Sequence, residues 1–149
     1  MIEIKEMQPQ DCHEVWLLQR DCFSHPWSES GIEEMFCTPG YHNLILCQKK
    51  RVIGYIGMKS VMDEADITNV AIAPDCRRQG MGKMLLERLL EDARDKKIER
   101  IYLEVRVSNE AAMALYEQAG FCQVGIRKNY YEKPMEDARI MMWELTARP

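Results

Sequence analysis

The sequence contains no long apolar run, no Cys-x-x-Cys pair and no histidine spacing typical of zinc sites. Its six cysteines and three histidines are scattered, so no metal site is predicted. The first residues, 1–5, form neither a basic leader nor an apolar signal core, and no stretch is long enough to cross a bilayer. We therefore expect a cytoplasmic protein with reduced thiols and no membrane partner.

An excess of positive charge is also missing. The formal net charge is -4 at pH 7, which argues against direct nucleic-acid binding and makes basic residues informative only where they cluster. The apolar fraction of 46% and the charged fraction of 30% are typical of globular proteins. With no linker, repeat or low-complexity segment, residues 1–149 are predicted to form a single domain. The oligomeric state is left open, with a monomer as the expectation.

The main basic cluster lies within residues 68–83, where an apolar strand leads through a glycine-containing loop into an amphipathic helix. Gly80 and Gly82 lack a Cβ, so their backbone can take positive φ and approach a bulky anion closely. Amides at a helix start lack intrahelical partners and lie at the positive end of the helix dipole. The pattern predicts a phosphate site made by Arg77, Arg78, Gln79, Gly80, Met81, Gly82 and Lys83.

Two common glycine loops are excluded by spacing. A Walker loop needs Ser or Thr after Gly-Lys, but Met84 follows Lys83, and a dinucleotide fingerprint needs glycine where Leu85 stands. The remaining Arg-Arg-Gln-Gly-Met-Gly resembles the pyrophosphate loop of the GCN5-related N-acetyltransferases, the GNAT family, which bind acetyl-coenzyme A (acetyl-CoA). The alternative is an arginine-rich surface turn before an ordinary helix. The neighbouring Cys76 is expected to be a packed side chain rather than a nucleophile.

Apolar periodicity predicts elements in the order β-α-α-β-β-β-α-β-α-β-β. The predicted strands are 1–6, 43–48, 52–61, 66–72, 101–105, 121–130 and 138–145. The predicted helices begin at Asp11, at Ser28 or Ser30, at Gly82, and at Ser108 or Asn109. The helix over 82–97 is predicted to carry Met84, Leu85, Leu86, Leu89, Leu90 and Ala93 on its apolar side. This order resembles the GNAT fold over nearly the whole chain. The resemblance implies an α/β fold with a mixed sheet of about seven strands and four helices, in which two splayed strands form the acetyl-CoA cleft.

In this family, the pantetheine arm of the cofactor lies between the splayed strands. By that resemblance, main-chain groups of Val70, Ala71 and Ile72 bind the arm and polarise the thioester carbonyl. Asn109 at a helix start is expected to contact the arm, or only to cap the helix.

Strand alternation places Glu104 and Arg106 on one face of the strand 101–105. An α-amine has a pKa near 8, so at neutral pH a base must remove its proton, directly or through water. Glu104 is the candidate base, and the alternative is an ion pair with a neighbour such as Arg106. Tyr116 is the candidate acid for the leaving thiolate, and its alternative is core packing.

Several segments narrow the resemblance to the RimI-like family, bacterial enzymes that acetylate the N-terminal alanine of a small-subunit ribosomal protein. The matching segments are 26–29, 103–109, 114–121 and 126–131. The resemblance implies Glu104 as general base and Tyr116 as general acid. Trp27, Tyr130 and Tyr131 are the expected substrate-binding residues, with core or edge packing as their alternative.

The leading prediction is therefore an acetyl-CoA-dependent N-terminal acetyltransferase that works by direct attack in a ternary complex. Lysine or a small amine is a possible acceptor as well, because the cofactor half of the fold does not select the acceptor. A CoA-binding sensor without turnover would need the phosphate loop but neither Glu104 nor Tyr116.

Overall fold

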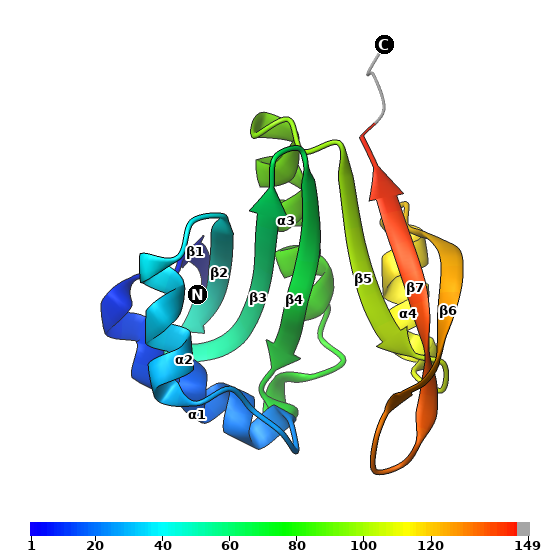
Figure 1. Cartoon of the computed structure of the whole chain (residues 1–149). Helices are drawn as coiled ribbons and strands as arrows, with labels where there is room; N and C mark the ends of the chain where they lie inside the picture. The colour runs from blue at the N-terminus through cyan, green and yellow to red at the C-terminus, as the bar shows by residue number, and fades with distance from the viewer. Residues whose placement is uncertain (146–149) are drawn as a thin grey trace.

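Seven strands form one mixed sheet in the order β1-β2-β3-β4-β5-β7-β6 (Figure 1). The structure is a computed structural model that describes residues 1–145. The strands are β1 Ile2–Glu6, β2 Tyr41–Gln48, β3 Arg51–Val61, β4 Glu64–Ile72, β5 Arg100–Arg106, β6 Cys122–Tyr131 and β7 Glu136–Glu144. The helices are α1 Cys12–Cys22, α2 Glu29–Glu34, α3 Met81–Asp95 and α4 Glu110–Gln118. The predicted element order and fold class are confirmed.

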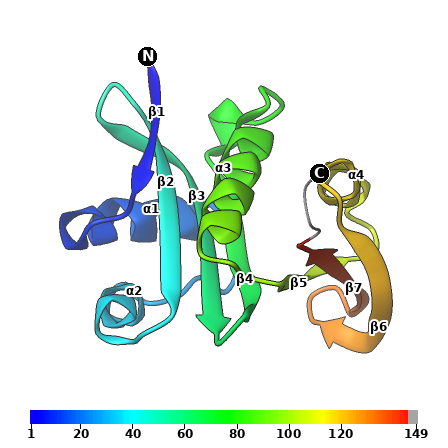
Figure 2. The ribbon, with the colours of Figure 1, turned by 90° about the horizontal axis from the view of Figure 1, so that it is seen from above.

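The helices cover both faces of the sheet. Helices α1 and α2 lie on one face, and α3 and α4 lie on the other (Figure 2). The core contains the buried side chains of β2, β3 and β5 and the leucines of α3. No helix within residues 1–145 has the length and apolar character needed to cross a membrane.

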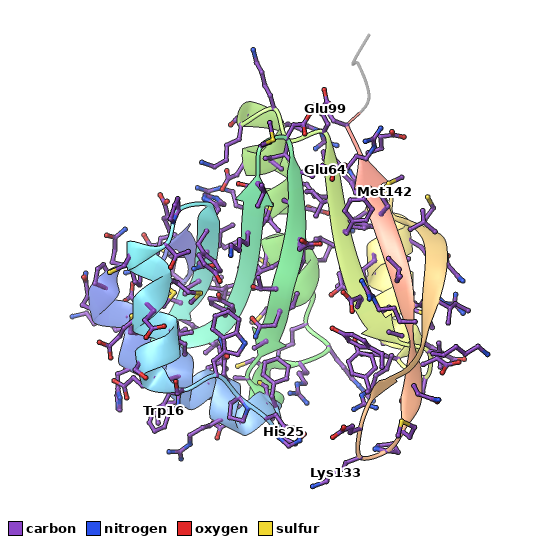
Figure 3. All side chains as sticks on the ribbon, in the orientation of Figure 1. Trp16, His25, Glu64, Glu99, Lys133 and Met142 are labelled. Carbon is purple, nitrogen blue, oxygen red and sulfur yellow. The ribbon has the colours of Figure 1, made fainter. Side chains whose placement is uncertain are left out.

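The pairing of β4 with β5 is short. These strands are parallel and pair only over Glu64–Asp66 with Arg100–Tyr102, whereas the other neighbours in the sheet are antiparallel. Beyond that point the two strands diverge toward the end of the sheet that carries His25 and Lys133, while Glu64 and Glu99 mark the paired end (Figure 3). The expected splay is confirmed, and it leaves one edge of β4 without a strand partner beyond Asp66.

A β-bulge shapes the divergent part of β4. Gly57 of β3 pairs with Asn69 and Met58 with Ile67, so Thr68 is the extra residue. A Cβ on Gly57 would lie 2.5 Å from the Tyr55 hydroxyl and 2.6 Å from Thr68 Oγ1. Glycine at this position therefore allows the bulge to pack against the tyrosine.

Helix α3 begins one residue before the predicted start. Gly80 is its N-cap residue with φ of 80°, and Met81 is buried in the first turn. Met84, expected on the apolar side with Leu85, is instead 40% exposed. At 100° per residue, Met84 falls opposite the buried stripe, so this prediction was wrong.

Two helix starts that the sequence left open are now assigned. Ser28 is the N-cap of α2, because its hydroxyl accepts from the Gly31 amide at 3.0 Å. Asn109 is the N-cap of α4 and accepts from the Ala112 amide at 3.1 Å. These caps hold the loops on opposite sides of the diverging strands.

Candidate active site

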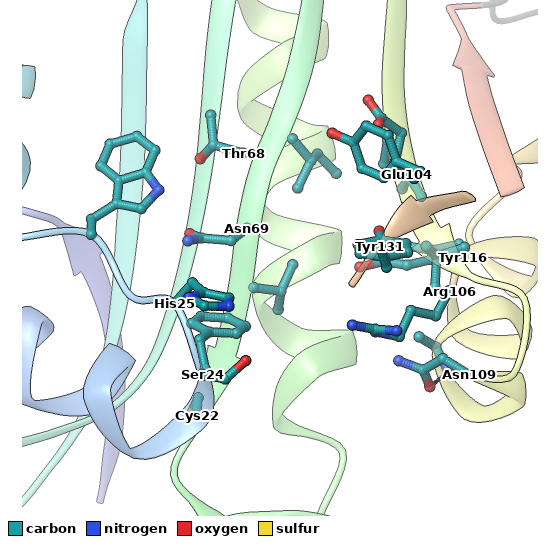
Figure 4. A pocket seen from close by; sticks show the side chains of 18 of the residues that line it. Cys22, Ser24, His25, Thr68, Asn69, Glu104, Arg106, Asn109, Tyr116 and Tyr131 are labelled. Atoms are coloured by element: carbon teal, nitrogen blue, oxygen red, sulfur yellow. Dashed lines mark hydrogen bonds between the residues drawn. The ribbon is translucent and has the colours of Figure 1, made fainter. Parts of the chain in front are cut away.

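A cleft of about 590 Å³ lies between the diverging ends of β4 and β5 (Figure 4). Its walls come from the α1–α2 loop and β4 on one side, and from β5, α4 and β6 on the other. Seven of the predicted site residues line it: Trp27, Val70, Glu104, Asn109, Tyr116, Tyr130 and Tyr131. Segments far apart in the sequence thus converge on one space.

Several cleft residues were not singled out from the sequence. They include Phe23, Ser24, His25, Thr68 and Asn69. Thr68 Oγ1 and Asn69 Oδ1 are buried, and neither has a hydrogen-bond partner among the described residues. The available signal was two adjacent polar residues, Thr68 and Asn69, between the apolar residues Ile67 and Val70, since buried polar atoms are normally paired.

Glu104 extends from β5 into the cleft (Figure 4). The predicted alternation is confirmed, because Leu103 and Val105 on either side are buried in the core. Its Oε2 atom is buried and has no hydrogen-bond partner within residues 1–145, and Arg127 Nε lies 3.6 Å away. The alternative of an ion pair with a neighbour is borne out with Arg127 rather than with Arg106, which pairs with Glu136 at 3.1 Å. The Oε2 atom of Glu104 thus has an ion-pair partner but accepts no hydrogen bond from the described residues.

The groups around Glu104 respond to its negative charge. Burial and the charge of Glu104 raise the pKa of Asp66 on the adjoining strand. A hydrogen bond to Glu104 raises the pKa of Tyr130, whose side chain is 49% exposed at the cleft mouth. The Glu104 carboxylate makes this part of the cleft favourable for a cation such as an ammonium group.

Tyr116 reaches the cleft from α4 and is only 8% exposed. Its ring packs against Phe121 with centroids 5.7 Å apart. Burial, with a smaller contribution from Tyr131, raises the pKa of Tyr116 to about 12. The two interpretations of Tyr116 thus combine, because one side chain fills the core and also lines the cleft as a protonated phenol.

The loop before α3 has the geometry of an anion site. Arg78 and Gly80 both have positive φ, and no acidic residue stands in the first turn of the helix. No side chain caps the helix start, so the first-turn amides of Met81, Gly82 and Lys83 lack intrahelical partners. A Cβ on Gly80 would meet no atom within 4 Å, which indicates open space above the loop. These features fit a diphosphate.

Two basic side chains of this loop have contacts elsewhere. Arg77 Nε donates to the Ile72 carbonyl at 3.1 Å, and Cys22 Sγ donates to the same oxygen at 3.3 Å. Lys83 lies 3.8 Å from Glu87. Arg78 and Gln79 are exposed. Arg77 thus ties the loop to the end of β4, and Arg78 is the better placed charge for a ligand.

The main chain of β4 can supply only part of the contacts predicted for the pantetheine arm, which were those of Val70, Ala71 and Ile72. The Ala73 amide donates to Ile53, so by alternation Ala71 pairs with Tyr55 of β3. The main-chain groups of Val70 and Ile72 then point to the open edge. Ala71 is buried and directed toward β3, so its predicted main-chain contact with the cofactor arm conflicts with the strand register.

No cluster of His, Cys, Asp or Glu within residues 1–145 is arranged to hold a metal ion. All six cysteines are free, and Cys76 beside the loop is buried.

The model of the acetyltransferase (GNAT) family matches residues 12–121. The chain belongs to the acetyltransferase (GNAT) family. It is therefore an N-acetyltransferase that uses acetyl-CoA as co-substrate, and the predicted family resemblance is confirmed.

Named relatives narrow the position of the chain within the GNAT family. It is 38% identical to the [ribosomal protein bS18]-alanine N-acetyltransferase of Salmonella typhimurium, over 95% of this chain and 96% of that protein. It is 36% identical to the enzyme of the same name from Escherichia coli, with the same coverage. The crystal structure of the ribosomal-protein-S18-alanine N-acetyltransferase from Escherichia coli superposes with a TM-score of 0.90, at 34% identity, covering 100% of this chain and 97% of that one. The resemblance to the RimI-like family is confirmed.

Proposed function

We propose that this GNAT enzyme transfers acetyl from acetyl-CoA to the N-terminal alanine of ribosomal protein bS18, by direct attack within a ternary complex. The proposal is supported by relatives at 36% and 38% identity over nearly the whole chain. The observation that carries its chemistry is one cleft lined by both a buried phenol and the carboxylate of Glu104, whose Oε2 atom accepts no hydrogen bond from the described residues.

The diphosphate of acetyl-CoA would be held by the amides of residues 80–83 and by Arg78 and Gln79. Main-chain groups of Val70 and Ile72 at the open edge of β4, together with Asn109, would contact the pantetheine arm. The bound co-substrate supplies an activated acetyl thioester. The chain's own task is to orient that arm in the cleft beside the acceptor amine.

Glu104 would take a proton from the acceptor amine, directly or through water. Because an α-amine has a pKa near 8, most of it is protonated at neutral pH and is unreactive until the proton leaves. Tyr116 would give a proton to the departing thiolate. Its pKa of about 12 keeps the phenol protonated over the physiological range, so the proton is always present.

The acceptor peptide would enter past Trp27 on one wall and Tyr130 and Tyr131 on the other. These rings would give an apolar passage for an extended chain end, and the Glu104 carboxylate beside them would attract its ammonium group. The protein would act as a monomer in the cytoplasm, without direct contact to nucleic acid.

A set of three peptides tests this function. A peptide copying the alanine terminus of bS18 should gain one acetyl group in the presence of acetyl-CoA, as measured by mass spectrometry. The same peptide with a blocked amino terminus should gain none. Acetylation of an internal lysine alone would contradict the N-terminal assignment. Binding of acetyl-CoA without turnover on any amine would instead favour the sensor.

A further inference from the structure

Arg106 joins β5 to the connection between β6 and β7. Its Nη1 donates to the Pro134 carbonyl at 3.0 Å and to Glu136 Oε1 at 3.1 Å. Its Nη2 donates to the Glu132 carbonyl at 3.0 Å. One side chain thus binds two carbonyls of the turn, residues 132–135, and the first residue of β7.

Glu136 extends this connection to the start of α4. Its Oε2 accepts from the Ser108 amide at 2.6 Å while Oε1 binds Arg106. Hydrogen bonds from Ser108 and the charge of Arg106 lower the pKa of Glu136, so the carboxylate stays ionised. Ser108 directly precedes Asn109, the cap of α4. The turn is therefore fastened to the β5–α4 junction from two directions.

The same guanidinium lies against the aromatic wall of the cleft. Its central carbon is 4.4 Å from the centre of the Tyr131 ring, and Tyr131 stacks edge-on against Tyr130 at 5.0 Å. Arg106 and Tyr131 line the cleft (Figure 4), and Tyr130 lines it as well. The orientation of these rings thus depends on a residue that is two positions along β5 from Glu104 and on the same face.

We propose that Arg106 is a positioning residue for the acceptor peptide, which holds the Tyr130-Tyr131 wall in register with Glu104 through Glu136 and the carbonyls of residues 132 and 134. This inference rests on the proposed function. Arginine suits the role because its planar fork donates in several fixed directions while its flat face stacks on a ring. A lysine ammonium has the charge but lacks both the fork and the flat face.

Steady-state kinetics on Arg106→Gln and Arg106→Lys test the inference. Because the tyrosines would bind the acceptor equally before and during reaction, their displacement should raise the peptide KM about tenfold and change kcat less than threefold. The dissociation constant of acetyl-CoA should stay within twofold. Arg100→Gln is the matched control, since Arg100 is on the same strand and face and also pairs with two glutamates, Glu64 and Glu144, at the end away from the cleft. Its KM should not change.

Two further measurements keep the result clear if Arg106 variants are poorly folded. In Glu136→Gln, the one amide oxygen can accept a hydrogen bond from Arg106 or from Ser108, but not from both. This variant should therefore raise the peptide KM, by less than Arg106→Gln does. Guanidinium ion at millimolar concentration should restore part of the peptide affinity of Arg106→Ala and should leave Arg100→Ala unaffected.

An unchanged peptide KM in Arg106→Gln would overturn the inference. So would an equal rise in the acetyl-CoA dissociation constant, or the same effect in Arg100→Gln, because either would indicate general loosening. If the wild-type enzyme does not acetylate the peptide at all, the proposed function fails first. The two failures are therefore distinguishable.

Discussion

Glu104 is the residue on which the proposed rate of transfer depends most. Glu104→Gln keeps the shape of the side chain but cannot take a proton, so kcat should fall about 100-fold at pH 7, a typical contribution of a general base. The deficit should shrink as pH rises and the amine loses its proton unaided. The measurement is a pH profile of kcat with the alanine peptide.

Glu99→Gln is the control for this change. Glu99 is exposed, precedes β5 and lies outside the cleft. Its variant should match the wild type, and calorimetry should give the Glu104 variant a normal acetyl-CoA affinity. A Glu104→Gln enzyme with full activity at pH 7 would remove Glu104 from the mechanism.

Tyr116 should act through its hydroxyl group. Tyr116→Phe preserves the packing on Phe121 and removes the proton, so kcat should fall about 10- to 100-fold while the peptide KM changes little. Because the pKa of Tyr116 is about 12, its deprotonation should cause no decline in wild-type activity between pH 7 and 10. Tyr41→Phe, outside the cleft, serves as control. If the activity of the wild type declined between pH 7 and 10, and Tyr116→Phe showed no such decline, this assignment would be contradicted.

At the scale of elements, the order of strand, glycine loop, helix and second strand predicted the parallel pair β4 and β5, and the splay of that pair followed from the resemblance to the GNAT family. The bulge at Thr68 was not, since an extra residue in a half-buried strand leaves the apolar pattern nearly unchanged. The partner of Arg106 was missed for a different reason. Glu136 is thirty residues away along the chain, so only the folded hairpin brings them together.

The loop before α3 provides a prediction that separates stability from binding. Gly80→Ala forces a residue with a Cβ into φ of 80° and should destabilise the fold by about 1 kcal/mol. Gly80→Asn should recover most of that loss, since asparagine tolerates this conformation. Both side chains occupy the open space above the loop, so both should weaken acetyl-CoA binding about tenfold.

Urea unfolding and calorimetry measure the two effects. Gly125→Ala is the matched control, because its Cβ would meet Ile140 at an ordinary 3.6 Å and the residue lies in β6, away from the loop. Its acetyl-CoA affinity should be normal. If Gly80→Asn bound the cofactor as tightly as the wild type, the loop would not be the diphosphate site.

At the scale of the molecule, the sheet forms two parts joined at one end. β1–β4 with α1–α3 make one part, and β5–β7 with α4 make the other (Figure 2). The strand pairing of β4 with β5 joins them, and the exposed Arg100 lies at that end, 3.3 Å from Glu64 and 3.4 Å from Glu144. Because the paired end is fixed, the cleft can remain open at the other end without loss of the core.

Phenols buried on both parts of the sheet should make the whole fold sensitive to alkali. Burial raises the pKa of Tyr55 on β3, of Tyr116 on α4 and of Tyr131 on β6, the last two to about 12. In the unfolded chain a tyrosine titrates near pH 10. The stabilisation is therefore complete below pH 10 and is lost as pH rises toward 12, because the unfolded state releases its protons first.

Tyr116→Phe isolates one of these contributions. A shift of about two pKa units corresponds to about 3 kcal/mol, so the wild type should lose more stability than the variant between pH 9 and 11.5. Urea midpoints measured across that range give the comparison, and at pH 8 the two proteins should differ little, since phenylalanine keeps the ring contact with Phe121. Parallel curves for the two proteins would mean that Tyr116 titrates as an exposed phenol. The role of Tyr116 as a proton donor would then be wrong. The burial that makes the fold sensitive to alkali is the same burial that keeps the phenol protonated and able to donate.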